Sequence, residues 1–221
     1  MAYHQPFQIT GFHSCDKEVG LDVLNGKKEL NHSNNTWDWL GSGIYFWEEN
    51  PARALEYAEK VAIGRQKNKI KNKTPFVIGA IIELGNCLNL LEPKSLSIVK
   101  KAHDSLEALY KEIDKPMPKN NDARRELDCA VIKYVHEINR KEREENGNKD
   151  ELPYDTIRCA FLEGDKIYKD SNFTDRLHIE ICVINKELIK GYFLPLPIQE
   201  FNPYLNKDFD ADKCKRKYGM I

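Results

Sequence analysis

The apolar positions at both ends of the chain predict strands separated by helices. Residues 6–13 (PFQITGFH) are apolar at spaced positions and predict a strand, and residues 43–47 (GIYFW) form an aromatic and β-branched run that predicts another. Residues 75–90 are the most apolar run of the chain. They predict a central strand, kinked at Gly79 or Gly85.

The C-terminal third returns to strand patterns. Residues 154–163 predict a strand, followed by a turn at residues 164–165 and a polar loop that reaches Arg176. Residues 177–185 alternate with period two, which predicts a strand with two different faces. One face carries Leu177, Ile179, Ile181 and Val183, and the other carries His178, Glu180, Cys182 and Ile184.

Helical spacing fills the segments between these strands. Asp16 is a predicted N-cap for a short first helix, and the pair Asn50-Pro51 is a start signal for a second. Residues 93–113 and 122–145 carry apolar residues at helical spacing. We interpret residues 93–150 as a helical insertion that covers one side of the sheet, or alternatively as a binding surface for a partner protein.

Composition narrows the class of protein. The 221 residues, 41% of them hydrophobic, suffice for one core, so we expect a single domain over residues 1–221. The 34 basic and 35 acidic residues leave no global field that would attract nucleic acid or membrane. Six scattered cysteines without metal-ligand spacing indicate reduced thiols and a cytoplasmic location. The first residues and the lengths of the apolar runs predict neither a signal peptide nor a membrane span.

Three short motifs resemble those of a known enzyme class. Residues 40–58 (LGSGIYFWEENPARALEYA) resemble the glycine, Ile-Tyr-Phe and Ala-x-x-Tyr pattern of the poly(ADP-ribose) polymerase and diphtheria-toxin class of ADP-ribosyltransferases. That class is named for a His-Tyr-Glu triad. Residues 11–15 (GFHSC) resemble its first motif, although Ser14 stands where the family usually has glycine. Residues 178–195 (HIEICVINKELIKGYFLP) resemble its final strand. The motifs occur in the family's order.

This resemblance implies a fold, a co-substrate and a site. The fold is α+β, with a split antiparallel sheet and a cleft for NAD+ between its halves. His13 holds the adenosine ribose, and the backbone of Ser14 contacts the nicotinamide amide. Gly43 of the turn is a further residue that binds the dinucleotide, and Tyr45 and Tyr57 stack on the nicotinamide ring. Glu180 stabilises the oxocarbenium-like transition state through the 2′-hydroxyl of the nicotinamide ribose, and no metal is required.

Core packing of the aromatic residues, and an edge strand that exposes Glu180 to solvent, are the plain structural alternatives for these residues. Neither alternative explains why all three motifs occur in order.

The acceptor residues are expected in the segment before the last motif. Its predicted acceptor-binding residues are His178 and the basic and aromatic side chains Lys166, Tyr168, Lys169, Phe173 and Arg176. Cations mixed with aromatic rings, together with basic runs at residues 65–73 and 213–217, favour RNA or single-stranded DNA over protein. In arginine-modifying relatives a glutamate stands where this chain has His178, so arginine is not the expected acceptor.

The resemblance therefore predicts a mono-ADP-ribosyltransferase that acts as a toxin or antiviral defence effector, paired with a cognate antitoxin or inhibitor protein. Three alternatives stay open: a transferase that modifies protein, an NAD+ glycohydrolase, and an inactive NAD+-binding module. An interaction protein built on the two middle helices would leave Glu180 unexplained.

Overall fold

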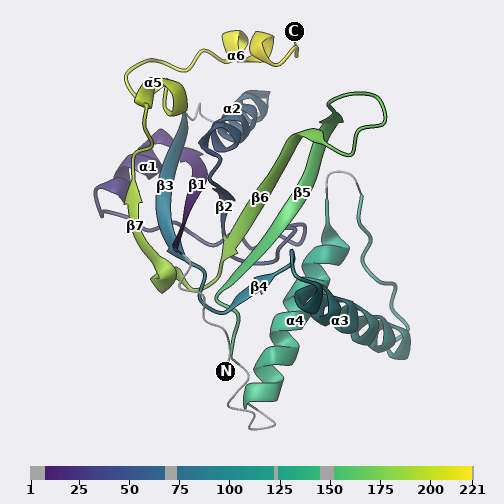
Figure 1. Cartoon of the computed structure of the whole chain (residues 1–221). Helices are drawn as coiled ribbons and strands as arrows, with labels where there is room; N and C mark the ends of the chain where they lie inside the picture. The colour runs from purple at the N-terminus through teal and green to yellow at the C-terminus, as the bar shows by residue number, and fades with distance from the viewer. Residues whose placement is uncertain (1–7, 68–73, 122–123, 145–151, 221) are drawn as a thin grey trace.

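The computed structural model of the 221-residue chain describes residues 8–67, 74–121, 124–144 and 152–220 (Figure 1). Its elements, in chain order, are β1 (Gln8–Asp16), α1 (Lys17–Leu24), β2 (Ile44–Glu48), α2 (Pro51–Lys67), β3 (Pro75–Glu83), β4 (Cys87–Asn89), α3 (Pro93–Glu112), α4 (Glu126–Glu144), β5 (Thr156–Lys166), β6 (Thr174–Val183), the 3-10 helix η1 (Lys186–Leu188), β7 (Ile189–Phe193), α5 (Ile198–Phe201) and α6 (Ala211–Lys217). The predicted α+β class is confirmed. Within the described residues, no helix is both long and apolar enough to cross a membrane.

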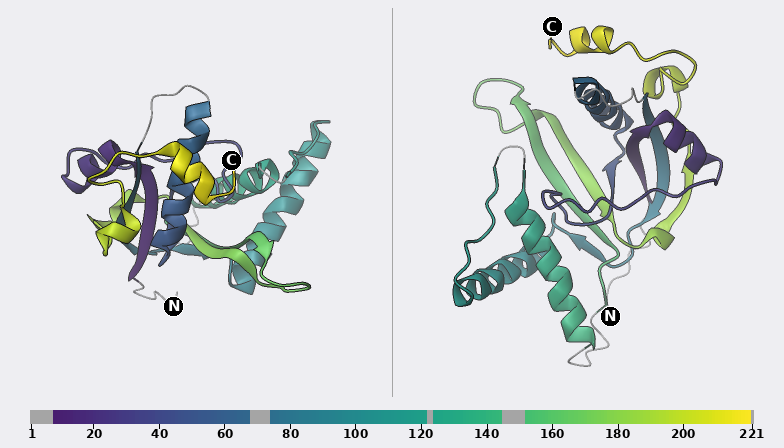
Figure 2. Two further views of the ribbon diagram at one scale, coloured as in Figure 1. Left: turned by 90° about the horizontal axis from the view of Figure 1, so that it is seen from above. Right: turned by 180° about the vertical axis from the view of Figure 1, so that it is seen from behind.

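The sheet consists of two diverging halves that share strand β2. Its order is β4-β5-β6-β2-β1-β3-β7, and every neighbouring pair is antiparallel except the parallel pair β4 and β5. Strand β2 pairs with β6 at four positions, from Ile44 to Trp47. It pairs with β1 at only two positions, Gly11 with Glu48 and Phe12 with Trp47. The β5–β6 half therefore separates from the β1–β3–β7 half beyond this short junction (Figures 1 and 2).

The predicted strand at residues 75–90 is two strands in opposite halves of the sheet. Strand β3 lies between β1 and β7, whereas β4 pairs with β5 at the far edge. The kink predicted at Gly85 is confirmed, because Gly85 adopts a positive φ of 56° between the two strands. Gly79 lies inside β3, paired with both Phe12 and Phe193.

Strands β5 and β6 form a longer hairpin than the sequence predicts. The predicted turn at Gly164 and Asp165 is wrong, because β5 continues to Lys166 and pairs there with Thr174. A bulge between Glu163 and Lys166 accommodates Gly164, whose φ is 86°. The connecting loop is residues 167–173. Strand β6 lies inside the sheet, so the edge-strand explanation of Glu180 is wrong as well.

Helices cover the sheet at three places, each with its own hydrophobic cluster. Helix α1 packs through Val23 on residues of β2 and β3, and α2 packs through Ala54 and Leu55 beside Trp47. Helices α3 and α4 pack against β4, β5 and β6 through a cluster that includes Leu106, Val135, Leu88, Ile157 and Cys182. The predicted helix pair therefore covers one side of the β5–β6 half.

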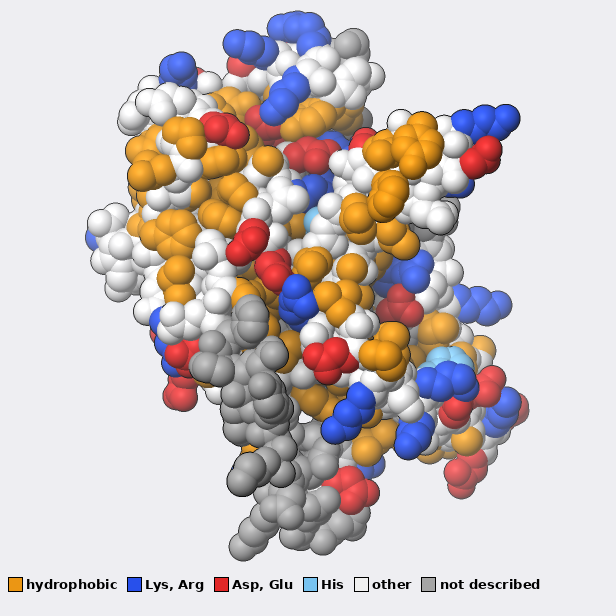
Figure 3. Space-filling model, viewed as in Figure 1, with side chains coloured by type: hydrophobic (Ala, Val, Ile, Leu, Met, Phe, Trp, Pro, Cys, Tyr) orange, Lys and Arg blue, Asp and Glu red, His pale blue; other side chains and the backbone are white. Residues whose placement is uncertain are grey.

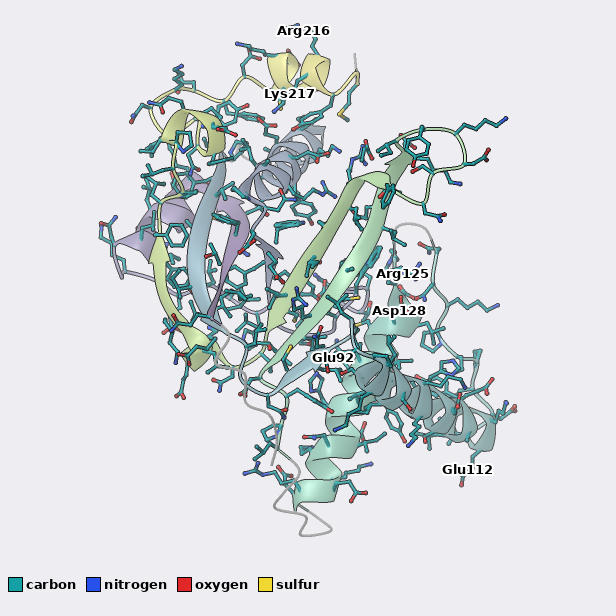
Figure 4. All side chains as sticks on the ribbon, in the orientation of Figure 1. Glu92, Glu112, Arg125, Asp128, Arg216 and Lys217 are labelled. Carbon is teal, nitrogen blue, oxygen red and sulfur yellow. The ribbon has the colours of Figure 1, made fainter. Side chains whose placement is uncertain are left out.

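The C-terminal segment is tied to α2 by a buried carboxylate. Glu59 of α2 is 1% exposed and accepts hydrogen bonds from the Tyr204 hydroxyl at 2.6 Å and from Nζ of Lys217 at 2.7 Å, as well as from the Tyr218 hydroxyl. Lys217 projects from α6 towards the rest of the molecule (Figure 4). One cation of the predicted basic run at residues 213–217 is therefore used to hold the fold.

Candidate active site

A cleft of about 520 Å³ lies where the two halves of the sheet diverge. Both halves line it, together with α2 and the segment before β2. Its lining residues are His13, Ser14, Asn31, Ser33, Asn35, Trp37, Asp38, Trp39, Gly43, Ile44, Tyr45, Trp47, Tyr57, Phe161, Glu163 and Glu180. The list contains all six residues assigned to the dinucleotide by resemblance: His13, Ser14, Gly43, Tyr45, Tyr57 and Glu180. The structure thus brings together residues that are up to 167 positions apart in the sequence.

His13 enters the cleft as a neutral imidazole. Its Nδ1 lies 2.8 Å from the backbone carbonyl oxygen of Tyr45, which only accepts, so Nδ1 carries the proton. Burial lowers the pKa of His13, and the hydrogen bond to Tyr45 offsets only part of this effect. The ring also packs against Phe46, with centroids 5.6 Å apart. Nε2 is therefore an acceptor for a ligand hydroxyl at neutral pH.

Tyr45 uses its hydroxyl to hold the glycine turn. The hydroxyl donates to the carbonyl oxygen of Gly41 at 2.7 Å and accepts from the N–H of Leu40 at 3.0 Å. Burial raises the pKa of the Tyr45 phenol far above its ordinary value, so the group stays protonated. With both polar functions engaged, Tyr45 offers the cleft its aromatic ring.

Gly43 is required by the close approach of β2 and β6. A Cβ atom at Gly43 would stand 2.8 Å from the carbonyl oxygen of Val183 and closer still to Sγ of Cys182. The backbone of Gly43 also exchanges two hydrogen bonds with Ser33, at 2.8 and 3.1 Å. These bonds place the preceding segment against the cleft.

The polar segment at residues 31–39 forms a wall of the cleft, a role that the sequence did not predict. Asp38 organises it by accepting hydrogen bonds from the Ser33 hydroxyl at 2.7 Å and from the backbone and side-chain N–H groups of Asn35 at 2.8 and 3.2 Å. Trp39 at its end packs edge-on against Phe161 of β5, with centroids 4.7 Å apart. Arg125, which directly precedes α4 (Figure 4), has its guanidinium carbon 5.0 Å from the centroid of the Trp39 ring. The indole is thus held from two sides.

Glu180 lies at the centre of the β5–β6–β2 surface. Trp47 of β2 and Cys159 of β5 are its cross-strand partners. The Glu180 side chain is 18% exposed, and its Oε1 lies 3.1 Å from Nε2 of His178. In the described residues, Oε2 of Glu180 has no hydrogen-bond partner. One carboxylate oxygen is therefore held and the other is available to a ligand.

Trp47 is a cleft residue that the motif comparison does not assign. It is only 6% exposed, and its Nε1 finds no hydrogen-bond acceptor in the part of the chain that the structure describes. Its ring packs against Tyr57 with centroids 5.2 Å apart, and Tyr57 itself is 47% exposed on α2. A buried indole N–H without a partner is costly. A bound ligand that supplied an acceptor would remove this cost.

The cleft continues past Ser14 into a second hollow of about 290 Å³. Ser14 and Tyr57 line both spaces, and the second is bounded by α1, α2 and the start of β3. Its walls are mixed, with the apolar Val61 and Ala62 on one hand and the polar Asp16 and Thr74 on the other. The two hollows therefore adjoin at Ser14 and Tyr57, and His13 lines the larger of them.

The predicted acceptor residues divide into three groups. Tyr168 and Phe173 are 59% and 56% exposed at the hairpin end, where Lys166 and Lys169 are exposed too. Hydrophobic side chains gather there beside charged ones (Figure 3). Arg176 lies further back, and its Nε pairs with Glu56 of α2 at 3.3 Å. His178 is buried, with 1% of its side chain exposed, so the structure does not place it on the hairpin surface with the other predicted acceptor residues. It faces Glu180 instead because period-two alternation puts both on one side of β6.

An ion-pair network closes the end of the cleft nearest the hairpin. Arg53 of α2 pairs with Glu163 of the cleft wall and with Glu56, at 2.9 Å for the latter. Glu56 also forms an ion pair with Arg176. The sequence gives no signal for this network, since its members come from three elements. Of the basic run at residues 65–73, residues 68–73 and the side chains of residues 65–67 lie outside the described part of the chain.

Comparisons with known proteins do not assign the chain to a family or an activity. The uncharacterized protein MJ0359 of Methanocaldococcus jannaschii is 26% identical to this chain over 220 residues, which cover 89% of the chain and 93% of that protein. No protein-family model matches the chain, and no solved structure matches it. The site must therefore be interpreted from its own geometry.

Proposed function

We propose that the protein is an ADP-ribosyltransferase that cleaves NAD+ at the bond between nicotinamide and ribose. The observation that carries the proposal is the meeting of His13, Tyr45 and Glu180 in one cleft. Their arrangement suits the dinucleotide: a hydrogen-bond acceptor at His13, an aromatic ring at Tyr45 and an available carboxylate oxygen at Glu180.

The chemistry requires a negative charge next to the reacting carbon. As the C1′–N bond of the nicotinamide ribose breaks, its electron pair leaves with the nicotinamide nitrogen, and positive charge develops on the ribose. A carboxylate fixed at this position stabilises that charge in the transition state more than in the ground state. An acceptor atom then forms the new bond to C1′ and loses its proton to solvent. Glu180 is the group proposed for the first role.

The acceptor in this proposal is a macromolecule that contacts the end of the β5–β6 hairpin. Lys166, Tyr168, Lys169 and Phe173 are exposed there, and the strands behind them lead directly to Glu180. Aromatic rings beside cations suit the bases and phosphates of single-stranded RNA or DNA. The choice of acceptor is inferred only from the exposed residues of the hairpin, and the proposed cleavage of NAD+ does not depend on it.

Nicotinamide release from NAD+ tests the proposal. Glu180→Gln keeps the shape of the side chain and removes its charge, so kcat should fall by roughly 10² or more while NAD+ still binds. Glu187→Gln is the matched control, because Glu187 is an exposed glutamate of η1 just after β6. It should keep wild-type turnover. Equal turnover in wild type and Glu180→Gln would sink the assignment.

Radiolabelled NAD+ separates the possible acceptors. Label on RNA or single-stranded DNA supports nucleic-acid transfer, and label on polypeptide supports transfer to protein. Label recovered only as free ADP-ribose means that water is the acceptor and that the enzyme is a glycohydrolase. NAD+ that binds without being cleaved would mark an inactive binding module.

A further inference from the structure

His178 is a buried titratable side chain held against the proposed catalytic carboxylate. Both of its ring nitrogens are engaged. Nδ1 lies 2.6 Å from the backbone carbonyl oxygen of Arg176, and Nε2 lies 3.1 Å from Oε1 of Glu180. The ring is also stacked on Phe161 of β5, with centroids 5.7 Å apart and planes at 26°. Three groups on the two strands of the hairpin therefore fix its orientation.

The two acceptors determine the protonation of the ring. A carbonyl oxygen accepts hydrogen bonds only, so Nδ1 must carry a proton. An ionised carboxylate also accepts only, so Nε2 must carry a second proton when Glu180 is charged. The alternative, a neutral His178 beside a protonated Glu180, would leave the proton on the weaker base, because imidazole is intrinsically more basic than a carboxylate. The geometry is that of an imidazolium paired with a carboxylate.

The surrounding groups act on this charge in opposite directions. Burial lowers the pKa of His178, but the hydrogen bonds to Glu180 and to the Arg176 carbonyl outweigh it, and the pKa is raised. Arg53, which faces the ring from α2, opposes protonation, while Phe161 on β5 is uncharged. Glu180 is therefore the group that keeps the imidazolium in place.

We infer that His178 is a positioning residue that, as an imidazolium, fixes the orientation of the Glu180 carboxylate. By engaging Oε1, it leaves Oε2 for a ribose hydroxyl and prevents rotation of the carboxylate about its last bond. This inference rests on the proposed function of Glu180. It gives His178 a role within the cleft wall instead of at the acceptor surface, and it predicts that the site loses its order when His178 loses its second proton.

Titration of His178 by NMR tests the pair without any need for activity. In the wild type, the imidazole carbon and nitrogen shifts should report a pKa above about 6.5 and protons on both nitrogens near pH 6. In Glu180→Gln the pKa should fall, because the charge partner is gone; in Glu187→Gln it should not change. His136, whose pKa is lowered by burial, is an internal reference that should titrate alike in all three proteins. The same His178 titration in wild type and Glu180→Gln would overturn the inference.

Kinetics test the positioning role. His178→Gln keeps a neutral donor but no charge, so kcat for nicotinamide release should fall roughly tenfold or more, as for residues that orient the ligands of a metal site. KM for NAD+ should change little. The wild type should lose kcat at alkaline pH as His178 loses its second proton, and the variant should not show this decline. A variant with wild-type kcat and an unchanged pH profile would contradict positioning. If the wild type releases no nicotinamide, the proposed function fails, while the NMR titration still decides whether the ion pair exists.

Discussion

The Nδ1 atom of His13 hydrogen-bonds with the backbone carbonyl oxygen of Tyr45 across the junction between β1 and β2. This bond connects two residues of the proposed triad at the one place where the halves of the sheet pair. It also fixes the tautomer of His13, since a carbonyl oxygen only accepts. The availability of Nε2 in the cleft is therefore a consequence of how the two halves are joined.

The pH dependence of stability should reveal the neutral state of His13. Its pKa is lowered in the folded protein, so its contribution to stability is present above the unfolded value of about 6.5 and is lost as pH falls through the folded pKa. The unfolding free energy of wild type minus that of His13→Gln should therefore decrease from pH 7.5 to pH 5. Urea unfolding of both proteins across this range measures it.

His178→Gln should show the opposite pH dependence of stability. Because the pKa of His178 is raised in the folded protein, its contribution is present below about pH 6.5 and is lost as pH rises through the folded pKa. The unfolding free energy of wild type minus that of His178→Gln should therefore decrease as pH increases. Parallel stability curves for wild type and either variant would contradict the corresponding assignment.

Local patterns were sufficient to predict much of the fold. The alternation in β6 placed His178, Glu180 and Cys182 on one face, and the hydrogen bond between His178 and Glu180 confirms that the first two share it. The helix start at Asn50 is confirmed too, because its side chain accepts from the N–H of Arg53 at 3.0 Å. Both predictions depend only on neighbours within a few residues.

Features that depend on distant partners were not predictable. Nothing local shows that β2 pairs with β6 on one side and β1 on the other, or that Asp38 makes a polar segment into a cleft wall. The sequence predicts a turn and loop after Glu163 because Gly164 and Asp165 are turn-forming residues followed by a polar segment. The pairing of the two strands is stabilised instead across the hairpin, where Asp175 accepts from the N–H of Asp165 at 2.8 Å. Such contacts are visible only once the chain is folded.

The two glycines Gly43 and Gly64 should respond oppositely to alanine. At Gly43 a methyl group would collide with Cys182 and the Val183 carbonyl, so Gly43→Ala should destabilise the protein by about 1–3 kcal/mol. At Gly64, inside α2, the added Cβ meets nothing within 4 Å, and Gly64→Ala should stabilise by roughly 0.5–1 kcal/mol. Denaturant midpoints at pH 7 measure both. A tolerated Gly43→Ala would show that β2 and β6 are not in close contact.

Trp47 should contribute a hydrogen bond to the bound dinucleotide. Trp47→Phe retains an aromatic ring beside Tyr57 and removes the unpartnered N–H, so the affinity for NAD+ should fall about fivefold, corresponding to about 1 kcal/mol. Titration calorimetry measures the change, and a denaturant curve confirms that the variant is folded. Unchanged affinity in a folded variant would mean that the indole N–H stays unpaired in the complex.

The acceptor surface can be separated from the NAD+ site because they are at different positions on β5 and β6. The tip lysines Lys166 and Lys169 are exposed, whereas Glu180 is further along β6 in the cleft. Changing both lysines to alanine should therefore reduce transfer to single-stranded RNA and weaken its dependence on salt, because fewer phosphate contacts release fewer counterions. Cleavage of NAD+ in the absence of RNA should stay at the wild-type rate.

A second lysine pair controls for net charge. Lys94 and Lys101 are exposed on α3, and their replacement by alanine removes the same two charges away from the hairpin. This control should transfer to RNA as the wild type does, if the position of the charges matters more than their number.

The two exposed aromatic residues of the hairpin test the same surface independently of charge. The double change Tyr168→Ala and Phe173→Ala should cost about 1–3 kcal/mol of RNA affinity for each lost stacking contact. Equal losses in the two lysine pairs, or label that appears only on protein, would exclude the hairpin as a nucleic-acid surface and favour a protein acceptor.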